Sequence, residues 1–122
     1  MIEHRLGEIA HARSGDKGSG ANVGVIAYTP EGYAFMKDYL SAARVEAFFK
    51  PMGVGVVTRY DWESIGAFNF MLPHILAGGG SRSLRIDAQG KALGQILLEM
   101  PISIDEAALD KCRRPDPAGR TA

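Results

Sequence analysis

Two strand-like segments near the N-terminus, separated by a short glycine-rich stretch, restrict the fold of this chain more than any other feature. Residues 5–13 alternate apolar and polar side chains with a period near two, which predicts a strand with one apolar side. Residues 21–28 are rich in valine and isoleucine and predict a second strand, buried on both faces. Residues 14–20 contain three glycines and predict a loop, so we expect the two strands to pair as a hairpin.

Helical and extended patterns follow one another along the rest of the chain. Thr29 and Ser41 are expected to cap two helices, the first over residues 30–40 and the second ending at Lys50 and Pro51. Strands are predicted at residues 54–60, 67–72 and 81–87, one helical turn at 73–77, and a helix of about ten residues around Leu93, Ile96, Leu97 and Met100. This order predicts an α+β fold, most simply an antiparallel sheet with helices on one face.

The length of 122 residues predicts one domain, since domains usually have ~100–200 residues. A Rossmann dehydrogenase and a TIM barrel are excluded by this length. We expect the domain to span residues 1–104. Residues 105–122 are a C-terminal extension, in which residues 105–111 predict one helical turn and residues 113–122, which have no large apolar side chain, predict a flexible tail.

Composition predicts a cytoplasmic protein that binds neither nucleic acid nor membrane. Cys112 is the only cysteine, and the chain does not open on a secretory signal, which together indicate a reducing cytoplasm. No apolar run approaches the ~18–20 residues of a membrane span. Fourteen lysines and arginines balance fourteen acidic residues, whereas a nucleic-acid-binding domain usually carries a basic excess.

The glycine-rich stretches match several known motifs only in part. Ser14 and Lys17 fit S-x-x-K, but the surrounding glycines do not favour the helix that this motif needs. Val23 stands where a dinucleotide-binding G-x-G-x-x-G needs its third glycine, and no lysine follows Gly20 as a P-loop requires. The three histidines show no metal-ligand spacing. We therefore expect no metal and no cofactor.

Two glycine clusters have cations at their borders, which favours an anion-binding site. A glycine-rich turn can direct several backbone N–H groups at one point, and Arg13 and Lys17 border the first cluster. The second cluster, residues 78–80, leads into Arg82. Tight turns with solvated charges remain an alternative. The residues predicted to contact an anion, a substrate or another subunit are Arg13, Ser14, Gly15, Asp16, Lys17, Gly18, Asn22, Gly78, Gly79, Gly80, Ser81 and Arg82.

Three residues are candidates for catalysis or substrate binding. His11 lies on an otherwise apolar strand, where a histidine is more often a hydrogen-bonded core or sheet residue than a catalyst. Asn69 is expected to point into an apolar layer and to hydrogen-bond buried backbone, a structural role that we favour over substrate binding. Lys17 is the third candidate, and Asp16 either orients it or closes an Asx turn.

Several runs of the chain together resemble one protein family. Residues 9–18 read IAHARSGDKG and residues 21–27 read ANVGVIA. Phe68, Asn69 and Phe70 follow, and then GGGSRSLR at residues 78–85 and QGKALG at residues 89–94. In order and spacing these runs resemble the small domain that ends acyclic-terpene-utilisation proteins of the AtuA type. The resemblance covers about residues 5–104, leaving only the tail outside.

This resemblance implies a fold and a cellular role. The family domain is a ferredoxin-like α+β sandwich and usually follows a much larger N-terminal domain in one chain. The present chain is therefore expected to be a small subunit that works with a separate, larger AtuA-like subunit, as a binding and assembly module. The implied pathway is the catabolism of acyclic terpenes or branched acids as CoA thioesters. The alternative is an independent enzyme on CoA esters or hydroxy acids, in which His11 or Lys17 is the acid or base and Asn69 or Ser14 positions substrate.

Two further expectations concern contacts. The chain has more aromatic residues than one small sheet needs to bury, so some should face another chain, and we expect a homo-oligomer when the large subunit is missing. These aromatic residues are Phe35, Phe48, Phe49, Trp62, Phe68 and Phe70. The two glycine-rich stretches are expected to meet at a sheet edge, with Arg13 and Arg82 on one side. There they would hold the phosphate or carboxylate of a thioester, or an acidic segment of the large subunit.

Overall fold

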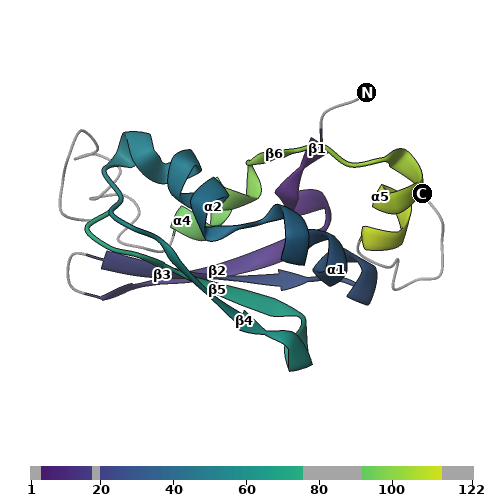
Figure 1. Ribbon diagram of the computed structural model, residues 1–122, viewed down its shortest axis with the longest axis horizontal. Helices are drawn as coiled ribbons and strands as arrows, with labels where there is room; N and C mark the ends of the chain where they lie inside the picture. The colour runs from purple at the N-terminus through teal and green to yellow at the C-terminus, as the bar shows by residue number, and fades with distance from the viewer. Residues whose placement is uncertain (1–3, 18–19, 76–91, 114–122) are drawn as a thin grey trace.

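The fold is a single layer of helices packed on one face of an antiparallel sheet (Figure 1). The computed structural model describes residues 4–17, 20–75 and 92–113. Four strands pair in the order β2, β3, β5, β4, where β2 is Ala10–Lys17, β3 is Gly20–Ala27, β4 is Thr58–Trp62 and β5 is Ala67–Leu72. The covering helices are α1 (Pro30–Tyr39), α2 (Ala42–Phe49) and α4 (Ala92–Leu98). The predicted α+β class is confirmed.

The first hairpin exists, but its boundaries differ from the prediction. The chain begins with a short strand β1 (His4–Arg5) and a 3₁₀ turn η1 (Leu6–Glu8), so residues 5–9 do not belong to β2. At the other end the ladder continues to the pair Lys17 and Gly20, which means that residues 14–17 are strand and not loop. A Cβ at Gly15 would make one ordinary contact, at 3.4 Å from the Asn22 side-chain oxygen on the paired strand.

The predicted capping of the first two helices is confirmed. The Thr29 hydroxyl accepts a hydrogen bond from the Gly32 backbone at 2.9 Å, and the Ser41 hydroxyl accepts one from the Arg44 backbone at 3.1 Å. After α2 the chain makes a 3₁₀ turn, η2 (Lys50–Met52), which ends at Gly53 with a φ of 85°. None of the helices in the described ranges is long and apolar enough to cross a membrane.

The second pair of strands is confirmed in type and partly in extent. In β5 the buried residues Phe68, Phe70 and Leu72 alternate with residues of the other face, as the period of two predicts. The partner strand β4 begins only at Thr58, four residues later than predicted, and a 3₁₀ turn η3 (Glu63–Ile65) joins the two strands. Residues 73–75 form a turn, and the strand predicted at residues 81–87 lies outside the described residues.

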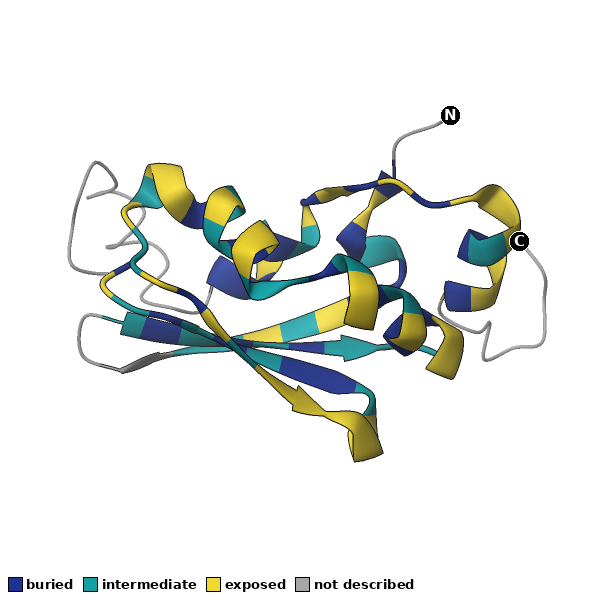
Figure 2. Ribbon diagram, viewed as in Figure 1, coloured by how far each residue is buried: buried dark blue, intermediate teal, exposed yellow. Residues whose placement is uncertain are grey.

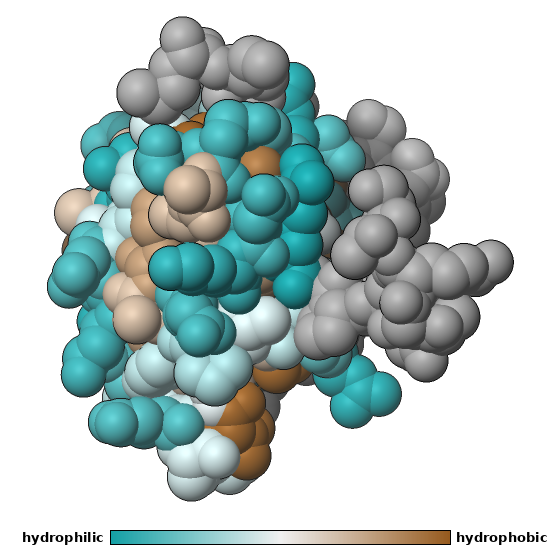
Figure 3. Space-filling model, turned by 90° about the vertical axis from the view of Figure 1, so that its right-hand side faces the viewer, coloured by the Kyte–Doolittle hydropathy of each residue, from teal (hydrophilic) through white to brown (hydrophobic). Residues whose placement is uncertain are grey.

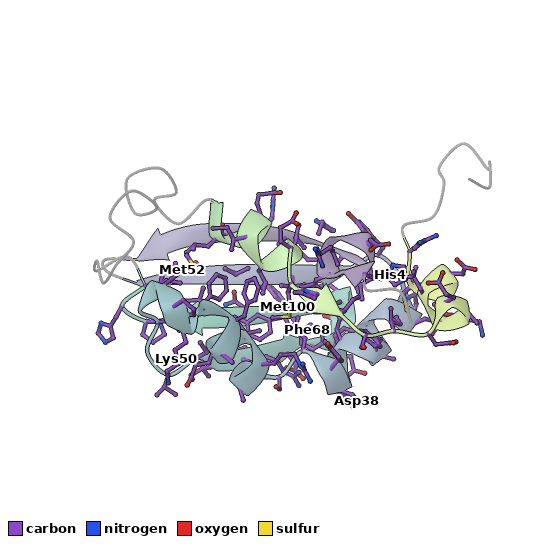
Figure 4. The ribbon with its side chains drawn as sticks, turned by 90° about the horizontal axis from the view of Figure 1, so that it is seen from above. His4, Asp38, Lys50, Met52, Phe68 and Met100 are labelled. Carbon is purple, nitrogen blue, oxygen red and sulfur yellow. The ribbon has the colours of Figure 1, made fainter. Side chains whose placement is uncertain are left out.

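The core lies between the sheet and the helices and includes Phe68 and Met100, which are both labelled near the centre of the molecule in the view from above (Figure 4). Of the six aromatic residues among which some were expected to face another chain, Phe49, Phe68 and Phe70 are fully buried there. Phe35 and Phe48 are partly buried against the same core. They are covered because the helices pack over the sheet with their apolar sides, so the surplus of aromatic residues expected from composition is largely absorbed by one core.

The first described residues and the C-terminal extension are joined to the domain by a strand pair, helix packing and ionisable side chains. β1 pairs with β6 (Pro101–Ile102), and α5 (Glu106–Cys112) packs against α1. The nearly buried His4 ring, beside α5 in Figure 4, contacts Glu8 at 3.2 Å through Nδ1 and Glu106 at 2.5 Å through Nε2. The extension is thus a two-turn helix packed on the domain, longer than the single turn predicted. Residues 114–122 lie outside the described part.

The charge on Glu8 is expected to stabilise the fold in a pH-dependent way. Burial raises the pKa of the Glu8 carboxyl, but the Arg5 backbone N–H, His4 and Arg113 lower it by more, so its pKa lies below the ordinary 4.5. A depressed carboxyl pKa contributes stability above the unfolded-state pKa, and this stability is lost as the pH falls through the folded-state pKa. Glu8→Gln should therefore lower the free energy of unfolding at neutral pH, by about 1 kcal/mol for this half-exposed group.

Urea denaturation of both proteins across the acid range measures this contribution. The difference between wild type and Glu8→Gln should shrink as the pH falls below 4.5, because the wild-type carboxyl then becomes neutral as well. Glu99→Gln is the matched control, since the exposed Glu99 carboxylate lies 3.9 Å from Arg5 and should contribute almost nothing. A difference that stays constant with pH would show that Glu8 acts through packing alone.

Candidate functional site

One face of the four-stranded sheet carries no helix among the described residues (Figure 1). Because alternate residues of a strand point to opposite faces, the residues of this open face follow from the register. They are His11, Arg13 and Gly15 on β2, Asn22, Gly24 and Ile26 on β3, Ala67, Asn69 and Met71 on β5, and Thr58, Tyr60 and Trp62 on β4. The open face thus gathers residues from four strands.

The open face is hollowed into a groove with a volume of about 630 Å³. The register places Arg13 beside Gly24, Gly24 beside Asn69, and Asn69 beside Tyr60, so one row crosses the whole sheet. Gly24 in the middle of this row has no side chain, while Arg13 and Tyr60 at its two ends are long. Short side chains on the central strands and long side chains on the edge strands make this face concave.

A pair of amides lies on the floor of this groove. The Asn22 side-chain nitrogen donates to the Asn69 side-chain oxygen at 3.3 Å. The expectation that Asn69 hydrogen-bonds buried backbone is wrong, because its side chain is half-buried on the open face and not in the apolar layer beneath. Among the described residues, the remaining amide groups, the Asn22 oxygen and the Asn69 nitrogen, have one weak contact, from the Asn69 nitrogen to the Met71 sulfur at 3.9 Å.

The groove has a positive end at Arg13. This side chain is exposed, and it has no hydrogen-bond or ion-pair partner within residues 4–17, 20–75 and 92–113. Asp61, which also lines the groove, is bound to Arg59 at 2.8 Å, so its charge is already compensated. An anion that enters the groove therefore meets one uncompensated cation and no uncompensated carboxylate among the described lining residues.

The opposite wall of the groove is aromatic and exposed. Tyr60 and Trp62 are 57% and 61% exposed, and Ile65 in the adjoining turn is 52% exposed. Figure 2 shows this end of the β4–β5 hairpin as exposed, and Figure 3 shows brown apolar atoms at the lower end of the molecule, where the hairpin projects. Sequence reasoning placed Trp62 at a contact but missed Tyr60 and Ile65. Extending the predicted strand by two residues would have put Tyr60 and Trp62 on one face.

Two other candidates lie apart from the groove floor. His11 is exposed on the open face and stacks on Tyr28, with ring centroids 5.4 Å apart, so of the two structural alternatives, core or sheet residue, it is a sheet residue. The Ser14 hydroxyl belongs to the opposite face, where it accepts a hydrogen bond from the Gly94 backbone of α4 at 3.1 Å. The structure therefore brings Arg13, Asn22 and Asn69 together, but it does not direct the Ser14 hydroxyl toward them.

Other predicted residues can be placed only in part. Asp16 and Lys17 belong to β2 by their backbone, and their side chains lie outside the described part. The same is true of the whole residues Gly18, Gly78, Gly79, Gly80, Ser81 and Arg82. The meeting of the two glycine-rich stretches therefore stays a prediction.

Cys112 is buried, and burial followed by the nearby Glu31 charge raises the pKa of its thiol, which disfavours the reactive thiolate.

Comparison with known proteins places this architecture in one family. The model of the AtuA ferredoxin-like domain matches residues 4–103, which include every strand of the structure. No curated protein and no solved structure matches the chain. The antiparallel sheet with helices on one face agrees with the ferredoxin-like α+β class predicted from the resemblance. The chain belongs to the AtuA ferredoxin-like domain family.

Proposed function

We propose that this chain is a binding and assembly module that docks through its open sheet face onto a larger AtuA-like subunit. The assembly would act in the cytoplasm, in the catabolism of acyclic terpenes or branched acids as CoA thioesters. One observation supports the docking surface: Tyr60, Trp62 and Ile65 stand exposed on a sheet face that no described helix covers. Contiguous exposed apolar groups of this kind are typical of interaction sites, because docking removes them from water.

A second copy of the chain is the expected occupant when the large subunit is missing. The same aromatic residues would then be covered by self-association, and the interface would be two-fold symmetric in the usual way of homodimers. Light scattering on the isolated chain at tens of micromolar, roughly the usual working range, should report a species larger than a monomer. Trp62→Ser should shift that species toward the monomer.

Docking is tested by co-expression with a larger AtuA-like protein from the same genome. A tryptophan that becomes buried in an interface often contributes about 2 kcal/mol or more to the binding free energy, so Trp62→Ser should weaken the complex about 30-fold. Val56→Ser is the matched control, since Val56 is 77% exposed but does not line the groove. Equal affinity of wild type and Trp62→Ser for the large protein would contradict docking through this face.

The same preparation separates an assembly module from an independent enzyme. If the chain is a module, CoA thioesters should be turned over only when the large protein is present. Turnover by the 122-residue chain alone would instead support the small-enzyme alternative, with His11 or Lys17 as acid or base. In that case His11→Gln and Lys17→Gln would each be assayed on the isolated chain.

A further inference from the structure

We infer that the groove of the open face is itself a binding site for a small molecule in which an anionic group is joined to a flat apolar body. The inference concerns the isolated chain and does not depend on docking to a large subunit. It rests on the opposite character of the two groove walls, Arg13 on β2 and the aromatic residues on β4, and on the floor between them.

Arg13 is suited to bind the anionic group. Its guanidinium offers several N–H donors in a fixed plane that matches a carboxylate or a phosphate. On its own strand the next residue of the same face is Gly15, and across the sheet its neighbour is Gly24, so no side chain at either position stands over it. The described residues give the guanidinium no other partner. An anion can therefore approach it from inside the groove.

Trp62 and Tyr60 are suited to hold the apolar body. Both rings stand on the far wall, and the floor beside Trp62 is apolar because its register neighbours are Ala67 and then Ile26. A flat body can lie over Ala67 and Ile26 with one edge or face against the rings, in the offset geometry that aromatic groups prefer. The small methyl of Ala67 leaves the room for it, as a larger residue would not.

The dimensions of the groove limit the size of the ligand. Three strand spacings separate β2 from β4, which corresponds to about 14 Å between their backbones. Arg13 and the rings extend inward from these strands, so a ligand that touches both walls is shorter than this span. The volume of about 630 Å³ is within the range of small-molecule sites. Between the walls, the Asn22 and Asn69 amides offer an acceptor and a donor to a polar group near the middle of the ligand.

Binding can be followed without a label because Trp62 is the only tryptophan of the chain. The probe is 4-phenylbutyrate, which carries a carboxylate and a phenyl ring but does not absorb where tryptophan is excited. 4-Phenylbutan-1-ol has the same ring and no charge. We expect a saturable change of Trp62 fluorescence with the acid and at least about tenfold weaker binding of the alcohol, since a charge-assisted hydrogen bond is lost. 4-Phenylbutyl phosphate then shows whether carboxylate or phosphate is preferred.

Two variants assign the response to the groove. Arg13→Gln should reduce the affinity for the acid to that for the alcohol. Gly24→Val should abolish binding of both probes, because its side chain fills the floor, where a Cβ would meet only the Arg13 carbonyl at 3.8 Å. Lys37→Gln on α1 removes an exposed positive charge from the helix layer and should change nothing. Circular dichroism confirms that each variant is folded.

The titrations distinguish a small-molecule binding site in the groove from a sheet face that binds only water. No saturable response, equal affinity for acid and alcohol, or an unchanged response in Arg13→Gln would each overturn the inference. Heat of binding in calorimetry without a change at Trp62 would place the ligand elsewhere and overturn it as well. Every titration uses the isolated chain, diluted until light scattering reports a monomer, so that self-association does not cover Trp62. These results are then separate from the success or failure of docking to a large subunit.

Discussion

Replacing Phe68 with alanine is expected to lower the free energy of unfolding by about 3–5 kcal/mol, the usual cost of removing a fully buried phenylalanine. The Phe68 ring stacks on Tyr33 of α1, with centroids 4.7 Å apart, and the Arg59 guanidinium lies 4.9 Å from its centroid. Phe68 therefore joins the central strand β5 to both a helix and the edge strand β4. Its loss leaves a cavity that none of these elements can fill without moving.

The loss of the Phe68 ring should also affect the C-terminal end of α1, because Arg59 contacts both. Its guanidinium donates to the carbonyls of Lys37 and Leu40 at 3.0 Å each, which gives partners to groups left over at the helix C-terminus. It also holds Asp61 at 2.8 Å. Without the Phe68 ring this guanidinium loses the surface on which it lies. We therefore expect Phe68→Ala to weaken the docking of α1 on the sheet as well as the packing below β5.

Tyr33→Phe is the matched control for the same stack. The Tyr33 hydroxyl is buried and finds no hydrogen-bond partner in the part of the chain that the structure describes. Removing the hydroxyl keeps the ring contact and should leave stability unchanged or raise it by up to about 1 kcal/mol. Urea denaturation measures both variants. A loss below about 1 kcal/mol in Phe68→Ala, within the range of a surface substitution, would show that the stack is not part of the core.

The sequence predicted those elements whose signals are local. Thr29 and Ser41 are capping residues that act within one helical turn, so α1 and α2 were correctly placed. The alternation in β5 reflects one buried and one open face of the same strand. The end of β2 could not be predicted in this way, because its glycine-rich residues indicate a loop locally, whereas they pair with Gly20–Val23 of the neighbouring strand.

The candidate site depends on register, which the sequence does not show. Asn22 and Asn69 are 47 residues apart and meet only because β3 and β5 pair at one of several registers. A slip by one residue would send Asn69 into the core and Phe68 to the open face. Motif and composition indicate Arg13, Asn22 and Asn69, but their shared face and the aromatic wall of Tyr60 and Trp62 follow from the strand order together with the register.

Gly94 lies in the middle of a helix and Gly24 in the middle of a strand, and they differ in how closely a neighbouring element approaches them. α4 packs against β2, and a Cβ at Gly94 would lie 3.3 Å from the Ala12 Cβ and 3.4 Å from the Ser14 hydroxyl. A glycine in a helix interior usually costs about 1 kcal/mol relative to alanine, so its place in α4 is explained by the close approach of helix and strand. The hydrogen bond from the Gly94 backbone to Ser14 depends on the same approach.

Gly94→Val is expected to lower the free energy of unfolding by about 3 kcal/mol, at the upper end of the cost of overpacking. The valine methyls would push α4 away from Ala12 and lengthen the 3.1 Å hydrogen bond to Ser14. The same substitution at Gly24 is the matched control, since a Cβ there has only one ordinary contact, at 3.8 Å, and valine favours a strand. Gly24→Val should therefore match or exceed wild type in thermal denaturation. Equal losses in both variants would mean that α4 does not rest on β2 as closely as its backbone indicates.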